Sequence, residues 1–259
     1  MMQGNFALVT GASQGLGRYF AQALAARKQN VVLVARTEST LAAVAADLET
    51  RYQVSAGIVP LDLTQRNAGR NLAEELRRRN LEIDLLVNNA GFGDQGEFGK
   101  LTLARQMEMI YLQNPAVVEL TYELLPPMIA QRRGGIINVS SMAGLQPIPY
   151  ATVYSATKSF LTTFSLALEA EVRRYGISVV TICPGRLRAD AAGDQGERKK
   201  VPGGEQAHED VVAEALKKLD QGGGLVIPGG MNKFAAFAER FIPRSKVARL
   251  VGKLSKPKD

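Results

Sequence analysis

Short apolar runs alternate along the chain with longer stretches in which apolar residues recur every three or four positions. The runs predict strands at 6–9, 31–35, 54–59, 83–87, 135–139, 177–183 and 225–227, and the stretches predict helices at 16–27, 38–52, 66–79, 103–130, 153–174 and 207–219. Strands that are apolar throughout belong to a parallel sheet covered on both faces. The pattern therefore predicts an α/β fold: a single-domain, Rossmann-like, doubly wound parallel sheet of about seven strands with helices on both faces.

The alternation ends near residue 230, so we assign 1–230 to a catalytic domain and 231–259 to a helical extension. Apolar residues there keep helical spacing: Phe234, Phe237, Ala238, Phe241 and Ile242, then Val247, Leu250, Val251 and Leu254. Of the net charge of +7, this extension holds +6, from eight basic and two acidic residues. Two interpretations stay open: a helix pair docked on its own subunit or on a neighbour, or contact with a membrane surface. No nucleic-acid binding is expected, because no nucleic-acid recognition motif accompanies the positive charge.

Composition argues against several classes of protein: disulfide-bonded, metal-binding, membrane-spanning and secreted. The single cysteine, Cys183, excludes an internal disulfide, and the single histidine, His208, argues against a metal site. No apolar segment approaches the roughly 20 residues that span a bilayer, and no basic segment precedes the first apolar run, so neither a membrane span nor a signal peptide is expected. We expect a cytoplasmic protein, and a peripheral association with a membrane stays open.

The first strand-to-helix turn is rich in glycine: residues 10–17 read TGASQGLG. In this position a dinucleotide pyrophosphate would lie on backbone N–H groups at a helix N-terminus. After the second strand, Arg36 stands where an acidic residue would select NAD(H), and its guanidinium suits a 2′-phosphate, which predicts NADP(H). Asp62, after the third strand, could accept a hydrogen bond from adenine or cap the helix that follows.

Polar residues also follow the next strands. Residues 88–91 (NNAG) could pin neighbouring backbones and line the cofactor cleft, and Asn114-Pro115 predicts a kink in the long helix. Ser141 follows the fifth strand and should face the same crevice as Tyr154. Tyr154 and Lys158 lie one turn apart on a helix, and an ammonium beside a phenol is expected to lower the pKa of the tyrosine.

The order and spacing of residues 10–17, Asp62, 88–91, Asn114, Ser141, Tyr154, Lys158 and Pro184-Gly185 resemble the short-chain dehydrogenase/reductase family over roughly residues 5–230. The resemblance implies a catalytic tetrad of Asn114, Ser141, Tyr154 and Lys158. In that family the tyrosine is the general acid/base and the serine polarises the substrate carbonyl. The lysine holds the nicotinamide ribose and lowers the tyrosine pKa, and the asparagine positions a water.

Pattern and resemblance together imply an oxidoreductase that transfers a hydride between NADP(H) and a carbonyl or secondary alcohol substrate, with NAD(H) the less favoured cofactor. The family also implies a homodimer or homotetramer. The expected cofactor-binding residues are Gly11, Ser13, Gln14, Gly15, Leu16, Gly17, Arg36, Asp62, Leu63, Asn89, Ala90, Gly91, Tyr154, Lys158, Pro184, Gly185 and Leu187.

The chain departs from the family pattern after Pro184-Gly185. Leu187 replaces the usual valine, and the threonine that would hold the nicotinamide carboxamide is missing. The polar, Gly-rich segment 190–204 could be a lid over the substrate or an ordinary loop. Two alternatives to a soluble reductase stay open: an NADP(H)-binding regulatory or scaffold protein with vestigial catalysis, and a membrane-associated reductase of lipid or ketoacyl carbonyls.

Overall fold

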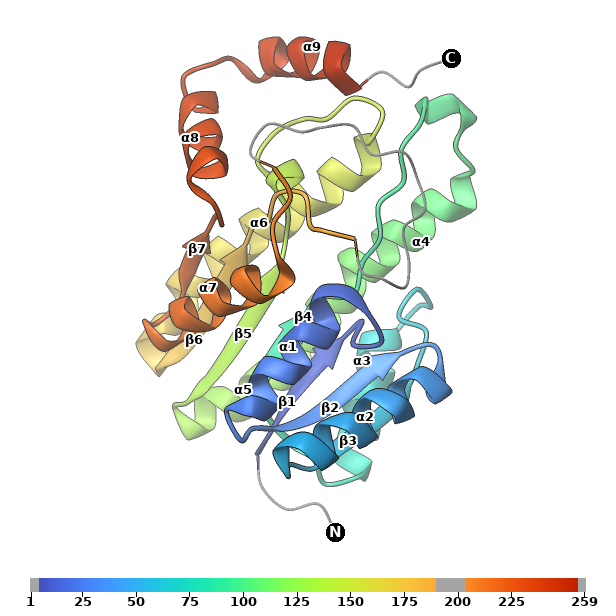
Figure 1. Ribbon diagram of the computed structural model, residues 1–259, viewed down its shortest axis with the longest axis vertical. Helices are drawn as coiled ribbons and strands as arrows, with labels where there is room; N and C mark the ends of the chain where they lie inside the picture. The colour runs from blue at the N-terminus through green and yellow to red at the C-terminus, as the bar shows by residue number, and fades with distance from the viewer. Residues whose placement is uncertain (1–4, 190–203, 256–259) are drawn as a thin grey trace.

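The protein is built on one parallel sheet of seven strands (Figure 1). The computed structural model describes residues 5–189 and 204–255, in which the strands are β1 (Asn5–Thr10), β2 (Asn30–Ala35), β3 (Ala56–Pro60), β4 (Glu82–Asn88), β5 (Gly134–Val139), β6 (Ile177–Ile182) and β7 (Gly224–Val226). Their order is β3-β2-β1-β4-β5-β6-β7, and each neighbouring pair is parallel. This confirms the predicted doubly wound sheet, whose direction of winding reverses between β1 and β4, the point where such folds bind ligands.

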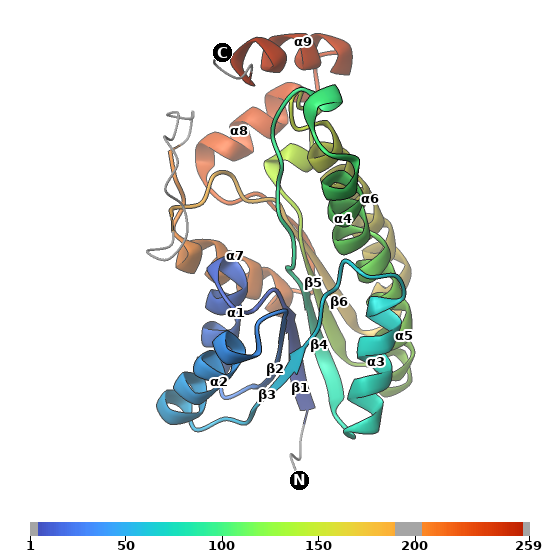
Figure 2. The same cartoon turned by 90° about the vertical axis from the view of Figure 1, so that its right-hand side faces the viewer.

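Helices cover both faces of the sheet (Figure 2). One face carries α1 (Gly15–Ala26), α2 (Glu38–Tyr52) and α7 (His208–Asp220); the other carries α3 (Ala68–Arg78), α4 (Leu103–Gln113), α5 (Pro115–Gln131) and α6 (Thr152–Val172). Short 3₁₀ turns are η1 (Phe98–Lys100), η2 (Met142–Gly144) and η3 (Arg173–Tyr175). Because all strands run the same way, their carboxyl ends share one edge, and the residues that follow them meet there.

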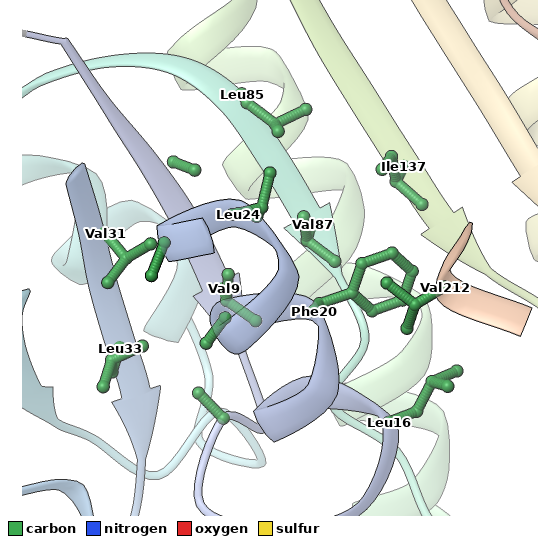
Figure 3. Close-up of a cluster of buried hydrophobic side chains, with 14 of the residues drawn as sticks. Val9, Leu16, Phe20, Leu24, Val31, Leu33, Leu85, Val87, Ile137 and Val212 are labelled. Atoms are coloured by element: carbon green, nitrogen blue, oxygen red, sulfur yellow. The ribbon is translucent and has the colours of Figure 1, made fainter. Parts of the chain in front are cut away.

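Apolar side chains of α1 pack on the strands of the sheet and form its core on that face. Phe20 of α1 is fully buried against side chains of neighbouring strands and of α7, including Val9, Val87 and Val212 (Figure 3). Fully burying a side chain of this kind contributes about 1.5–3 kcal/mol. Side chains alternate along β1 between the two faces of the sheet. Val9 packs under α1, whereas Phe6 and Leu8 belong to a second core cluster, under α3, α5 and α6.

Several predicted boundaries differ from the structure, and one predicted helix is divided in two. Strand β3 begins at residue 56 rather than 54, and α3 begins at residue 68 rather than 66. Asn67, which precedes α3, has left-handed backbone with φ 59°, and turns occupy the residues before it. The predicted helix 103–130 is two helices, α4 and α5, because Asn114 takes φ −126° and ψ −74° ahead of Pro115.

The extension forms α8 (Gly230–Glu239) and α9 (Arg244–Ser255), which lie beyond the carboxyl edge of the sheet (Figure 1). Val247 is buried, and a Cβ on Gly252 would lie 3.1 Å from the Pro149 ring, so α9 packs on the loop before α6. One face of the extension is therefore docked on its own chain. Within the described ranges, none of the helices combines the length and apolar character needed to cross a membrane. The proposed lid lies almost entirely in 190–203, outside the described residues.

Candidate active site

A pocket of about 710 Å³ opens along the carboxyl edge of the sheet, across the point between β1 and β4 where the direction of winding reverses. Its volume lies in the usual range for ligand pockets, about 300–1,000 Å³. It runs from the end of β2 past the glycine-rich turn to the start of α6. The predicted residues that line it are Gly11, Ser13, Gln14, Gly15, Leu16, Arg36, Asp62, Leu63, Asn89, Ala90, Gly91, Ser141, Tyr154, Lys158, Pro184, Gly185 and Leu187.

The glycine-rich turn presents the N-terminus of α1 to this pocket. The N-cap residue Gln14 makes no side-chain capping bond, and backbone N–H groups at such a helix start suit an anion. Gly17 does not line the pocket: a Cβ there would lie 2.2 Å from the Gly11 carbonyl oxygen and 2.5 Å from Asn89 Nδ2. Gly17 therefore serves close packing of the turn against the β4 loop.

Thr10 and Asn89 clamp the ends of β1 and β4 together. Thr10 Oγ1 donates to the Val87 carbonyl at 3.2 Å and accepts from the backbone N–H groups of Asn89 and Ala90, both at 3.0 Å. Asn89 Nδ2 donates in return to the Thr10 carbonyl at 2.9 Å. The expectation that these amides pin neighbouring backbones is confirmed.

Arg36 and Asp62 stand at the far end of the pocket, on neighbouring strands. Asp62 Oδ1 accepts from the Thr64 backbone N–H at 3.0 Å and from its hydroxyl at 2.9 Å. Burial opposes ionisation of Asp62, but the Thr64 and Gln65 hydrogen bonds and the nearby Arg36 charge together lower its pKa. Asp62 thus caps a turn, not the start of α3. The same pocket end holds Thr37 and Thr40, hydroxyl donors that the sequence analysis did not single out.

Tyr154, Lys158 and Ser141 converge at the other end. The first turns of α6 lie tightly against η2, because a Cβ on Gly144 would be 2.7 Å from the Lys158 carbonyl oxygen. The Ser141 side chain is near enough to the Tyr154 phenol to oppose the rise of its pKa. Lys158 Nζ donates to the Val139 carbonyl at 2.8 Å and lies 5.9 Å from the centre of the Tyr154 ring. The three groups face the pocket together.

The pKa values differ from the sequence expectation. Burial of the phenol raises the pKa of Tyr154, with the Ser141 hydrogen bond opposing it in part. Burial of the amine lowers the pKa of Lys158 to about 8. The predicted lowering of the tyrosine pKa by Lys158 is therefore wrong for this structure, because desolvation dominates and the lysine directs its charge at the Val139 carbonyl.

Asn114 lies behind the pocket rather than on its wall. It is buried at the break between α4 and α5, and its Nδ2 donates to the Thr157 carbonyl in α6 at 3.1 Å. Because Pro115 has no N–H to donate, the break has a direct chemical cause. The break and this bond fix α4 against α6 one turn below Tyr154.

Three further residues line the pocket without a sequence signal that marks them. Gln113 is buried and donates from Nε2 to the Phe92 carbonyl at 2.9 Å, and the Arg105 guanidinium stacks 3.6 Å from the centre of the Phe92 ring. Gln113 could have been noticed as a polar residue beside Asn114. Arg105 reads in the sequence as one more surface cation.

Known proteins share this fold and are similar in sequence. The profile of the short chain dehydrogenase family matches residues 5–200. A very-long-chain 3-oxoacyl-CoA reductase from Coprinopsis cinerea is 36% identical over 182 residues, which cover 70% of this chain and 54% of that protein. Inactive hydroxysteroid dehydrogenase-like protein 1 from Pongo abelii is 32% identical over 185 residues, covering 70% and 55%. A solved short-chain dehydrogenase from Sphingobium yanoikuyae in complex with NADPH superposes with TM-score 0.78 at 27% identity, covering 91% of this chain and 93% of that one.

This chain therefore belongs to the short-chain dehydrogenase/reductase family, as the resemblance predicted. The chain spans about half the length of the curated relatives it matches.

The buried lysine predicts a pH-dependent stability. Between pH 8 and pH 10.5 the folded amine has lost its proton, whereas the unfolded chain still binds one. The free energy of unfolding should therefore rise with pH across this window in the wild type relative to Lys158→Met, which cannot titrate there. Urea unfolding of both proteins from pH 7 to 10.5 measures the difference, and parallel curves would contradict the burial argument.

Proposed function

We propose that this protein is an NADP(H)-dependent oxidoreductase that interconverts a ketone and a secondary alcohol, with 3-oxoacyl thioesters as the substrate class. The observation that carries the proposal is the convergence of Tyr154, Ser141 and Lys158 on one pocket that is also lined by the glycine-rich turn before α1. The substrate class rests on the relatives named as very-long-chain 3-oxoacyl-CoA reductases.

The residues of the site supply position and charge stabilisation. The nicotinamide, when bound, would supply the hydride that adds to the carbonyl carbon. As negative charge grows on the carbonyl oxygen, the Ser141 and Tyr154 hydroxyls donate to it, and the Tyr154 phenol gives up its proton. Tyr154 is protonated at neutral pH and can act as the acid in the direction of reduction, and burial, which raises its pKa, makes the phenol a weaker acid than it would be in water. Lys158 holds the ribose end of the cofactor from within the same helix, and Asn114 holds α4 against that helix.

NADP(H) fits the end of the pocket near β2. Arg36 is exposed at the pocket wall, beside the hydroxyls of Thr37 and Thr40, and no carboxylate occupies its position. A guanidinium with two hydroxyl donors suits a 2′-phosphate. The NADPH complex of a structural neighbour supports the same choice.

A second candidate is an NADP(H)-binding regulatory protein with vestigial catalysis. One relative of similar identity is named as an inactive protein. In this chain, Tyr154, Ser141 and Lys158 are all present at the pocket, which favours the enzyme.

The extension supports contact with an anionic lipid surface, which would suit a reductase of acyl substrates. Met231, Phe234 and Phe237 of α8 and Phe241, in the turn that follows it, recur at spacings of three and four and are between 58% and 74% exposed. Two copies joined through this face would bring two +6 extensions together. An anionic membrane surface instead attracts such charges, by about 1 kcal/mol for each lysine or arginine near it.

The homodimer or homotetramer stays a prediction, which light scattering would test; a molar mass of one chain would contradict it. The cytoplasmic location stays a prediction as well.

The first test concerns the chemistry. Consumption of NADPH with 3-oxoacyl-CoA substrates of increasing chain length should fall about 10²–10⁴-fold in Tyr154→Phe, because the general acid is lost, while NADPH binding remains. Tyr175→Phe, a change in η3 within the second core cluster, is the control and should retain activity. Equal turnover in wild type and Tyr154→Phe would contradict the assigned role. Absence of turnover in both, with NADPH bound, would favour the regulatory protein.

The second test concerns the cofactor. Arg36→Leu should weaken NADPH binding about 10- to 100-fold, because a charge-assisted hydrogen bond contributes about 1.5–3 kcal/mol. The affinity for NADH should change little, since NADH has no 2′-phosphate. Fluorescence titration with both cofactors measures this. An equal loss for NADH and NADPH would show that Arg36 does not contact the 2′-phosphate.

The third test concerns the extension. The triple variant Phe234→Ser, Phe237→Ser, Phe241→Ser should lose sedimentation with vesicles of phosphatidylglycerol and phosphatidylcholine, because its apolar stripe is removed. A double variant at equally exposed apolar residues outside the extension, Leu103→Ser and Tyr122→Ser, is the matched control and should still bind. Wild type should bind pure phosphatidylcholine vesicles less. If the triple variant binds as well as wild type, the membrane contact is refuted.

A further inference from the structure

The segment after Pro184-Gly185 is held by Gln206, a residue 21 positions further along the chain. Gln206 Oε1 accepts from the Gly185 backbone N–H at 2.7 Å. Its own backbone N–H donates to the Arg186 carbonyl at 2.8 Å, and its carbonyl accepts from the Arg188 N–H at 2.9 Å. Three hydrogen bonds from one residue thus fix the chain from Gly185 to Arg188.

A fourth bond links this segment to the extension. Gln206 Nε2 donates to the Pro228 carbonyl at 2.7 Å, and Asn232 Nδ2, in the first turn of α8, donates to the same carbonyl at 3.0 Å. Both contacts are close. A Cβ on Gly185 would lie 2.5 Å from Asn232 Nδ2, and a Cβ on Gly229, where φ is +83°, would lie 2.9 Å from Gln206 Nε2. Side chains on these glycines would separate the two segments.

The hydrogen bonds of Gln206 matter because the segment that they hold lines the pocket. Gly185 and Leu187 line the pocket, and the Met142 backbone N–H donates to the Pro184 carbonyl at 3.0 Å, which holds the start of this segment beside Ser141. If the 2′-phosphate lies at Arg36, the nicotinamide lies beside Gly185 and Leu187. The segment lacks a threonine side chain of its own to anchor a ligand there: after Leu187 come Arg188 and Ala189.

We propose that Gln206 is a positioning residue for the nicotinamide end of the cofactor site, acting through the backbone of residues 185–188 and joining that backbone to the start of α8. The inference rests on the proposed NADP(H) site and adds to it a residue outside the pocket wall. Because the amide is an acceptor toward Gly185 and a donor toward Pro228, only an amide side chain of this length makes both bonds.

The test separates the two halves of the cofactor. Gln206→Ala should raise the dissociation constant of NADPH about tenfold, as expected for one or two lost hydrogen bonds. It should leave the dissociation constant of adenosine 2′,5′-bisphosphate unchanged, because that fragment reaches only the Arg36 end. Calorimetry with both ligands measures this, and Gln221→Ala, at the end of α7, is the control variant.

Gln206→Glu divides the two bonds and serves also if Gln206→Ala does not fold. A glutamate still accepts from the Gly185 N–H but cannot donate to the Pro228 carbonyl. It should recover part of the NADPH affinity relative to Gln206→Ala. Unchanged NADPH affinity in both variants, or an equal loss for NADPH and the bisphosphate, would overturn the proposal. Absence of NADPH binding in the wild type would instead refute the proposed function itself.

Discussion

The whole site depends on the constraint that the strands are parallel and their carboxyl ends are held at one edge. Hydrogen bonds from side chains, not only the sheet ladder, keep those ends in place. Thr10 and Asn89 join β1 to β4, and Asn88 Nδ2 donates to Asn138 Oδ1 at 2.8 Å, which joins β4 to β5. Asn138 Nδ2 then donates to Ser165 Oγ in α6 at 2.8 Å. These bonds favour one arrangement of the strand ends, because a shift would leave further buried donors and acceptors unpaired; Asn88 Oδ1 already has no hydrogen-bond partner among the described residues.

The same burial that builds the site determines its charges. Lys158 is 5% exposed, and its amine has one protein acceptor, the Val139 carbonyl. Desolvation lowers its pKa and raises that of Tyr154, so both groups favour their neutral forms more than they would in water. The protonated phenol of Tyr154 is the acid in the direction of reduction. The pKa of Lys158, about 8, would rise if a bound ligand accepted a hydrogen bond from its amine. The direction of both shifts has one physical cause, the burial of these side chains where α6 packs on η2.

The apolar pattern was sufficient to predict the sheet, its parallel sense and most helices, because burial on both faces leaves a mark in every strand. Local chemistry predicted the glycine turn, the Asn114-Pro115 break and the pairing of Tyr154 with Lys158. Three things could not be predicted. The start of α3 depends on Asn67 adopting left-handed backbone, and the Tyr154 pKa depends on burial. Gln206 acts on Gly185 across 21 residues through backbone bonds, for which no local spacing gives a sign.

The Pro228 carbonyl connects the extension with the cofactor pocket through hydrogen bonds. It accepts from Gln206, which holds the pocket segment, and from Asn232, which begins the helix with the exposed phenylalanine stripe. A displacement of α8 would therefore shift the backbone at Gly185. Conversely, a pocket whose residues 185–188 are held in one conformation would favour one position of α8. If a lipid surface and NADPH each select the same placement, the coupling must be reciprocal. Lipid contact would then tighten NADPH binding by the factor by which NADPH tightens lipid contact. An enzyme of acyl substrates would in that way bind its cofactor most tightly at the surface where such substrates are found.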